Sequence, residues 1–259
     1  MDFDTIKLTT EGRVAILTLN RPDKRNAISP HMIEELLAAF DEIESGFARA
    51  VILTGAGKAF CAGMDLETLR ESADASHAQH IEDSRRTARL FQRIWSFPKP
   101  TIAAVNGAAI AGGSGLATLC DFTLATPESK FGYTEINIGF IPAFVSVFLV
   151  RQIGEKRARD LLLSARIFDA AEALQLGLVS MVVARECLLG RAREIASAIV
   201  AASPSSLLHT KHLLIASEAS SVDRELEAAI EASAFVRDTP DFKEGLAAFL
   251  EKRPPKWIG

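Results

Sequence analysis

The sequence predicts an α/β core followed by a helical C-terminal region. Strand-like segments alternate with helical segments along the first part of the chain, and helical segments follow one another after Gly154. The chain has 259 residues with 48% hydrophobic content, which is enough to bury a large core. No internal repeat or low-complexity tract interrupts this organisation.

Composition excludes several classes of partner. The net charge is −4 with 24% charged residues, so there is no basic footprint for nucleic acid or for an anionic membrane surface. The most apolar stretch, residues 139–150, is too short to cross a bilayer. Three widely spaced cysteines, Cys61, Cys120 and Cys187, form no disulfide framework, and the N-terminus does not read as a signal peptide. Together these features predict a protein of the reducing cytoplasm.

The first half of the chain supplies the predicted strands. Residues 6–20 alternate and turn at Glu11-Gly12, which predicts a β-hairpin. Ser29 and Pro30 cap and begin a helix that runs to about Glu44. The further predicted elements are a strand over 48–57, a loop over 58–66 that turns into a short helix near Asp65, a helix over 75–95, a strand over 99–107, a helix over 112–120 and a strand-turn-strand over 121–132.

The second half of the chain is mainly helical. A strand over 178–183 interrupts a series of helices, most of which begin with a capping residue or a proline. These helices are predicted over 155–165, 169–177, 185–201, 204–217, 221–235 and 240–251. The polar, weakly patterned residues 69–80 are predicted to be mobile and to act as a lid.

Several motifs with known chemistry are incomplete. "GAGKAF" has Ala59 where a phosphate loop needs Ser or Thr, and "GGSGLAT" has Thr118 where a dinucleotide fingerprint needs glycine. "GGSGL" has Leu116 where a nucleophile elbow needs glycine, so Ser114 is a poor nucleophile candidate. No metal site is expected either. His209 and His212 can share a helix face, but no third ligand accompanies them.

Two small-residue turns offer backbone chemistry instead. "AAIAGGSGLATLC" leads into a helix, and exposed N–H groups there can hold a phosphate or an oxyanion. On its own this stretch favours close packing of a helix on a strand, which is the simpler interpretation. "AFCAGMDL" is a second turn of the same kind, so two N–H groups could converge on one carbonyl oxygen.

Glu135 is the candidate acid/base. It stands among apolar neighbours in "FGYTEINIGFIPA", and burial would raise its pKa into the range where it trades protons near neutrality. The alternative is a surface residue at the start of a helix. The residues alone leave both interpretations open.

Taken in order, the motifs resemble the crotonase superfamily, the enoyl-CoA hydratase/isomerase family. The resemblance rests on "LNRPDKRNAIS", "GAGKAFCAGMDL", "KPTIAAVNGAAIAGGSGLATLCD", "FGYTEINIGFIP", "GEKRARDLLLSARIFDAAEALQLGLVSMVV" and "EGLAAFLEKRPPKW". It implies a crotonase-like spiral of ββα units with the acyl-CoA site over residues 1–195. It also implies a helical oligomerisation region over 196–259, and homotrimers or dimers of trimers.

The resemblance also implies site residues. The N–H groups of Met64 and Gly112 would hold the thioester oxygen of an acyl-CoA substrate. The substrate's own coenzyme A would be the only cofactor-like group, with no metal or redox cofactor. Residues expected to meet it are Lys24, Arg25, Ala27, Lys58, Ala62 and Leu66, with Phe249 and Lys252 reaching the nucleotide, often that of a neighbouring subunit. Residues 70–80 and 141–148 are expected to line the acyl pocket.

One departure from the family pattern bears on the reaction. Many hydratases of this family use two glutamates; Glu135 matches one, but Gly115 stands where the other would fall. One carboxylate suits a double-bond shift, in which a single base removes and returns a proton. Asp65 and Asp121 are weak substitutes, because they are expected to cap a helix and to start a strand. We expect hydration of a 2-enoyl-CoA, with Δ3-Δ2-enoyl-CoA isomerisation and a non-catalytic acyl-CoA scaffold as alternatives.

Overall fold

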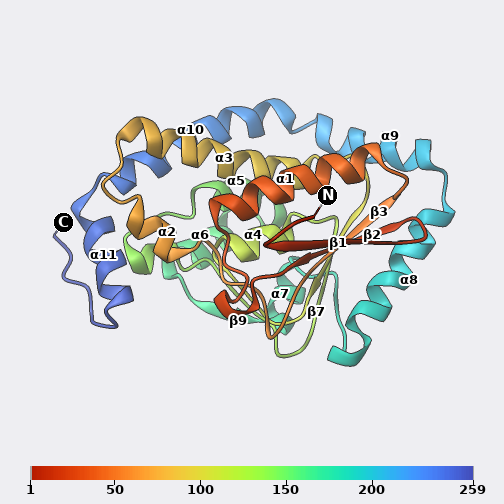
Figure 1. Ribbon diagram of the computed structural model, residues 1–259, viewed down its shortest axis with the longest axis horizontal. Coiled ribbons are helices and arrows are strands. Elements are labelled where there is room, and N and C mark those ends of the chain that lie inside the picture. Colours follow the sequence, from red (N-terminus) through yellow and green to blue (C-terminus); the bar gives the residue numbers. More distant parts are fainter. Residues whose placement is uncertain (1, 259) are drawn as a thin grey trace.

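The computed structural model describes residues 2–258 and contains two β-sheets surrounded by helices (Figure 1). The larger sheet has six strands in the order β1-β2-β3-β5-β7-β10, and the smaller has four in the order β4-β6-β8-β9. The strands are β1 (Ile6–Glu11), β2 (Val14–Leu19), β3 (Ala50–Gly55), β4 (Ala59–Cys61), β5 (Thr101–Val105), β6 (Ala108–Ile110), β7 (Phe122–Ala125), β8 (Lys130–Gly132), β9 (Ile167–Asp169) and β10 (Met181–Val182). All pairs are parallel except β1 with β2 and β8 with β9.

Successive strand pairs build the two sheets together. In each of the pairs β3/β4, β5/β6 and β7/β8, the first strand joins the larger sheet and the second joins the smaller. Helices follow each pair: α2 (Leu66–Glu71) and α3 (His77–Trp95), then α4 (Gly112–Thr118), then α5 (Ala143–Ile153). This repeat is the spiral of ββα units that the resemblance implied, and it confirms the predicted α/β class.

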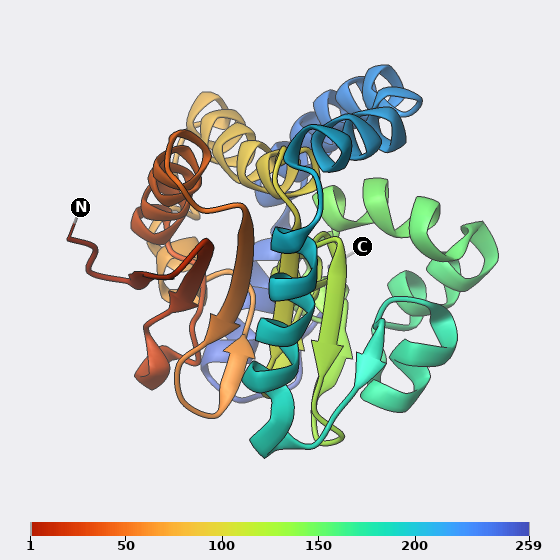
Figure 2. The ribbon, with the colours of Figure 1, turned by 90° about the vertical axis from the view of Figure 1, so that its right-hand side faces the viewer.

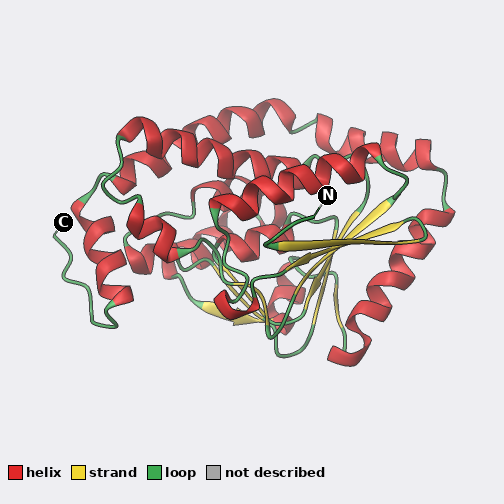
Figure 3. Cartoon of the chain, in the orientation of Figure 1, coloured by secondary structure: helices red, strands yellow, loops and turns green. Residues whose placement is uncertain are grey.

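The remaining helices surround this spiral (Figure 3). Helix α1 begins at the predicted Pro30, and Ser29 caps it by accepting a hydrogen bond from the Met32 N–H. The others are η1 (Pro22–Lys24), α1 (Pro30–Ser45), η2 (Glu135–Ile138), α6 (Glu155–Ser164), α7 (Ala170–Leu176), η3 (Arg185–Cys187), α8 (Leu188–Ala201), α9 (Pro204–Ala216), α10 (Ala219–Arg237) and α11 (Pro240–Leu250). The predicted helical C-terminal region is confirmed.

The short strands depart from the predictions. Strand β4 forms within the predicted loop 58–66, and β9 forms where no strand was predicted. The strand predicted over 178–183 shortens to β10. A strand of only three residues shows too little alternation of apolar and polar side chains to be recognised in the sequence. Strands β4 and β9 form because neighbouring strands pair with them.

The larger sheet is covered on both faces. One face packs on the main core with α1 and α3, and the other packs on α8 through side chains such as Ile16, Ile52 and Ala192. Figure 2 shows α8 crossing this second face. The predicted boundary between residues 195 and 196 falls within α8. No helix of residues 2–258 has both the length and the apolarity that a membrane span requires.

Candidate active site

A cavity of about 680 Å³ lies where α2, α3, α10 and α11 meet η2 and the start of α4. It brings together most of the residues singled out in the sequence. Those on its lining are Lys24, Arg25, Ala27, Ala62, Met64, Leu66, Gly112, Glu135 and Phe249. Lys58 and Lys252 do not line it. Of the two segments expected at the acyl pocket, residues 141–145 line it, but Ser72 alone does so from residues 70–80.

The Met64 amide is aimed by a short parallel bridge with Ile28. The Ile28 N–H donates to the Gly63 carbonyl at 2.8 Å, and the Asp65 N–H donates to the Ile28 carbonyl at 2.9 Å. Successive amides of an extended segment point to opposite sides, so the Met64 N–H points away from Ile28. Gly63 makes this turn at φ +88°, a conformation that a residue with a Cβ rarely adopts.

The Gly112 amide is the first of helix α4. The first N–H groups of a helix have no acceptor within that helix, so this donor is open to another partner. Ala111 precedes it at φ 53° and ψ −125°, a strained conformation for a residue with a side chain. The Ala111 N–H is anchored by donating to the Gly132 carbonyl at 2.7 Å.

The two turns are in direct contact. A Cβ on Gly63 would lie 2.9 Å from the Ala111 Cβ and 3.5 Å from the Gly112 nitrogen. Any side chain at Gly63 would therefore push the Met64 and Gly112 amides apart. The structure places Met64 and Gly112 on the lining of one cavity.

Glu135 starts η2 in a buried position and is only 8% exposed. Its Oε2 has no hydrogen-bond partner among the described residues. Burial raises the pKa of this carboxyl to about 7, although a contact with its own backbone amide acts the other way. Glu135 is therefore a buried carboxylate on the lining of the cavity and not a surface residue at the start of a helix.

Gly115 leaves no room for a second carboxylate. A Cβ there would lie 2.4 Å from Phe91 Cε1 and 2.5 Å from Val145 Cγ1. Both neighbours are buried and line the cavity, so a side chain at Gly115 would have to displace them from their packed positions.

The two aspartates considered as substitutes have structural partners. Asp65 caps α2 by accepting from the Glu67 N–H, and it pairs with Arg21 at 2.8 Å. Asp121 lies off the cavity, where it accepts from the Thr101 N–H at 2.7 Å and pairs with Lys211 at 2.6 Å. Their expected roles as a cap and a residue at a strand start are confirmed.

The loops expected to meet coenzyme A are tied together. The Ala62 N–H donates to the Arg25 carbonyl at 3.0 Å, and Arg25 adopts φ 51°. Lys24 pairs with Glu67 at 2.7 Å in an exposed position. Both cations therefore stand at the rim of the cavity.

Phe249 reaches the cavity of its own chain, because α11 packs closely on η2. A Cβ on Gly139 would lie 2.3 Å from the Asp241 carbonyl oxygen, and one on Gly245 would lie 2.5 Å from the Ile138 carbonyl carbon. These two glycines let the helices touch backbone to backbone.

The sequence interpretation missed a polar wall of the cavity, formed by α3 and α10. It includes Ser84, Thr87, Ser233 and Arg237. A signal for it was present. Buried residues recur at intervals of three or four along one face of α10, and they are Val222, Leu226, Ile230, Ser233 and Arg237. The apolar face of this helix therefore ends in a buried arginine, which is unusual enough to indicate a polar site.

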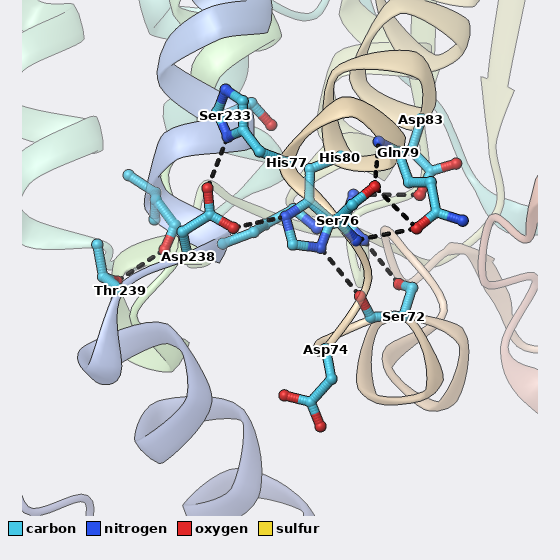
Figure 4. A network of polar contacts seen from close by, with 12 residues as sticks. Ser72, Asp74, Ser76, His77, Gln79, His80, Asp83, Ser233, Asp238 and Thr239 are labelled. Atoms are coloured by element: carbon cyan, nitrogen blue, oxygen red, sulfur yellow. Dashed lines mark hydrogen bonds and ion pairs between the residues drawn. The ribbon is translucent and has the colours of Figure 1, made fainter.

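The segment 69–80 was predicted to be mobile and to act as a lid. It comprises the end of α2, a turn and the start of α3, tied to the end of α10 (Figure 4). His80 is fully buried, with Nδ1 3.0 Å from Asp238 Oδ1 and Nε2 3.0 Å from the Ser72 carbonyl oxygen. His77 Nδ1 contacts the other oxygen of Asp238 at 2.6 Å. The polar side chains of this segment, which show no helical pattern in the sequence, thus form hydrogen bonds with residues distant in the chain.

Among residues 2–258, the side chains spaced for a metal ion are Asp4, His31 and Glu35, away from the cavity. The Glu35 carboxylate already accepts hydrogen bonds from the Asp4 and Thr5 N–H groups. His209 and His212 do not belong to this group.

Comparisons with known proteins assign the chain to a family. The family model described as enoyl-CoA hydratase/isomerase matches residues 9–259, so the chain belongs to the enoyl-CoA hydratase/isomerase family. A Thermus thermophilus protein, whose name assigns it to the enoyl-CoA hydratases, is 46% identical over 95% of this chain and 98% of its own. The short-chain-enoyl-CoA hydratase of Clostridium acetobutylicum is 35% identical over 98% of this chain and 97% of its own.

The fold comparison gives the same family. The crystal structure of an enoyl-CoA hydratase/isomerase from Xanthobacter autotrophicus Py2 superposes with a TM-score of 0.90 and 34% identity, covering 97% of this chain and 98% of that one. The chain is thus an enzyme of the crotonase superfamily, of the hydratase/isomerase kind.

Proposed function

We propose that this enzyme adds water to the double bond of a 2-enoyl-CoA thioester, with Glu135 as its single acid/base. The observation that carries the proposal is the unpartnered Oε2 of buried Glu135, in the cavity that the Met64 and Gly112 turns also line. The names of the relatives support hydration as the reaction.

The proposed steps use only these groups. The Met64 and Gly112 N–H groups donate to the thioester oxygen, where negative charge develops. Glu135 removes a proton from water as the water oxygen bonds to C3, and the electrons of the double bond move toward the thioester as an enolate. Glu135 then returns a proton to C2, which completes the addition. No cofactor beyond the substrate's own coenzyme A takes part.

A second candidate is the shift of a 3-enoyl-CoA double bond to the 2-position. It is favoured by the packing of Phe91 and Val145 at Gly115, which leaves one carboxylate to do all proton transfer. Glu135 would remove a proton from C2 and return one to C4. The same carboxylate would thus take a proton from water and return one to C2 in hydration, but take a proton from C2 and return one to C4 in isomerisation.

Thioester absorbance separates the two reactions. Hydration removes the conjugated 2-enoyl chromophore of crotonyl-CoA, whereas isomerisation of a 3-enoyl-CoA creates one. Glu135→Gln should lower either rate by about 10²–10⁴-fold. The matched control, Glu231→Gln on the exposed side of α10, should leave it unchanged. Turnover that survives Glu135→Gln would remove this residue from the mechanism, and absence of any turnover would favour the acyl-CoA scaffold.

We further propose that the chain assembles into homotrimers or dimers of trimers. Support comes from large apolar side chains on helix α9, where Leu208, Leu213 and Leu214 are 44%, 74% and 73% exposed. Isolated exposed apolar residues are common, but several on one helix suit a subunit interface. Sedimentation should give a trimer or hexamer mass, and a monomer at micromolar concentration would contradict the assembly.

A further inference from the structure

The cavity has walls of opposite chemistry. The side formed by η2, α5 and Phe91 is apolar and includes Ile138, Ile141, Phe144 and Val145. The side formed by α3 and α10 presents hydroxyls and charges. A plain hydrocarbon chain would satisfy the first wall and leave the second without partners.

Arg237 is the centre of the polar wall. It is 3% exposed, and its guanidinium donates from Nη2 to Ser72 Oγ at 2.6 Å and from Nη1 to Asp83 Oδ2 at 3.3 Å. Its Nε is buried and has no partner among the described residues. A guanidinium has five N–H donors, so these contacts use fewer than half of its capacity. A buried cation with incomplete pairing is costly unless something else completes its contacts.

The acids near Arg237 do not complete them. Asp83 makes a single contact with it, and the Asp83 side chain is itself 37% exposed. Asp238, the next residue in the chain, has both oxygens engaged by His77 and His80 (Figure 4). Both oxygens of the Asp238 carboxylate therefore contact histidine rings and not Arg237.

The local charge on this wall is positive. Arg86 of α3 lines the same cavity, and its carboxylate partner Glu34 stands 3.8 Å away and is not on the lining. The α3–α10 wall thus presents two arginines against one aspartate, Asp83. The hydroxyls of Ser84 and Ser233, 3.1 Å apart, add neutral hydrogen-bonding groups beside them.

We propose that the acyl group of the substrate ends in a carboxylate that Arg237 binds, so that the enzyme prefers CoA monothioesters of unsaturated dicarboxylic acids. The planar fork of a guanidinium matches a carboxylate with two parallel hydrogen bonds, and such charge-assisted contacts are among the strongest available. The inference rests on the proposed function, since it takes this cavity to be the enoyl-CoA site. It adds the chemical class of the acyl tail.

The test compares matched substrates. A series of 2-enoyl-CoA thioesters of increasing chain length is prepared with either a methyl group or a carboxylate at the far end. At the length that reaches Arg237, the wild-type enzyme should prefer the carboxylate member by about 10- to 100-fold in kcat/KM, mainly through KM. Methyl-ended substrates that are preferred at every length would overturn the proposal.

Variants assign the preference to Arg237. Arg237→Met should abolish the preference, because carboxylate-ended substrates lose their charged partner, and a cooperative thermal unfolding transition shows whether the variant is folded. Arg237→Lys should keep part of the preference, because it retains the charge without the fork. Arg224→Met, an exposed arginine on the same helix, is the control and should keep all of it. A preference that survives Arg237→Met would refute the role of this residue.

A binding measurement keeps this test independent of the reaction. Saturated thioesters, with and without the terminal carboxylate, are titrated calorimetrically into the wild-type protein and Arg237→Met. Tighter binding of the carboxylate form that Arg237→Met removes would support the proposal even if no 2-enoyl-CoA is hydrated. Equal binding of the two forms would refute it even if hydration is found.

Discussion

The ring of Phe91 occupies the space that a side chain at Gly115 would need. A Cβ at Gly115 would lie 2.4 Å from Phe91 Cε1, and Phe91 is itself buried against Phe144, with ring centroids 6.1 Å apart. The single-carboxylate site is therefore a property of the packing of three elements, α3, α4 and α5. Replacing the glycine alone cannot convert it into a site with two carboxylates.

Gly115→Ala should destabilise the protein by about 1–3 kcal/mol, because a methyl group would force Phe91 and Val145 off their packed positions. Urea denaturation measures this free energy of unfolding. The control is Gly190→Ala in α8, where nothing lies within 4 Å of the added methyl. It should stabilise the helix by roughly 0.5–1 kcal/mol. Equal stability of Gly115→Ala and wild type would show that Phe91 and Val145 can shift at no cost in free energy.

Gly115→Glu should raise the rate of hydration only when Phe91 is also shortened. The single substitution should misfold or lose activity, whereas Gly115→Glu combined with Phe91→Ala gives the new carboxylate room. We expect the double variant to hydrate crotonyl-CoA about 10-fold faster than Phe91→Ala alone, a fraction of what a positioned acid/base contributes. Initial rates on the three variants decide the matter. A double variant no faster than Phe91→Ala would mean that a carboxylate here cannot assist.

The rate should depend on pH through Glu135. Its carboxyl must be ionised to remove a proton, and burial raises its pKa to about 7. The kcat/KM profile should therefore rise with pH and level off above an inflection near pH 7. An inflection near the ordinary value of 4.5 would show that the acid/base group is solvated in the free enzyme.

The same carboxyl links stability to pH with a defined sign. The folded-state pKa of Glu135 is above its unfolded value of 4.5, so the folded state holds the proton more tightly. Its contribution to the free energy of unfolding should fall as pH rises from 4.5 to 7, by an amount on the order of 3 kcal/mol. Glu135→Gln removes this contribution. The variant should be more stable than wild type at pH 8, and the difference should shrink toward pH 4.5; a constant difference between the two would contradict the linkage.

Strain at Ala111 should be relieved by glycine. Ala111 adopts φ 53° and ψ −125° immediately before the Gly112 amide. Such a conformation costs about 1–3 kcal/mol, and glycine's added chain entropy offsets part of the relief. Ala111→Gly should therefore raise stability by about 1 kcal/mol and the melting temperature by about 2–4 °C. A lower melting temperature would mean that the alanine methyl contributes more through packing than its strain costs.

The local elements were predictable where the chain carries a long pattern. The β1–β2 hairpin, the Ser29 cap of α1 and the C-terminal helices follow from alternation, capping residues and helical spacing. The short strands β4 and β9 were not predictable, because they exist through pairing with β6 and β8. The packing of residues 69–80 was not predictable, because their partners, such as Asp238, lie far away in the chain.

By itself the sequence determined the α/β class, the family resemblance and the candidate amides and acid, since these depend on residue type and order. Only the tertiary structure decided that Glu135 is buried with a free oxygen, because burial depends on segments that meet through folding. It alone decided that Phe91 and Val145 fill the space at Gly115, and that Arg237 of α10 faces the same cavity. The physical reason is the same for all three. The environment of a side chain is set by residues that are distant in the sequence, and the local sequence pattern does not show which residues those are.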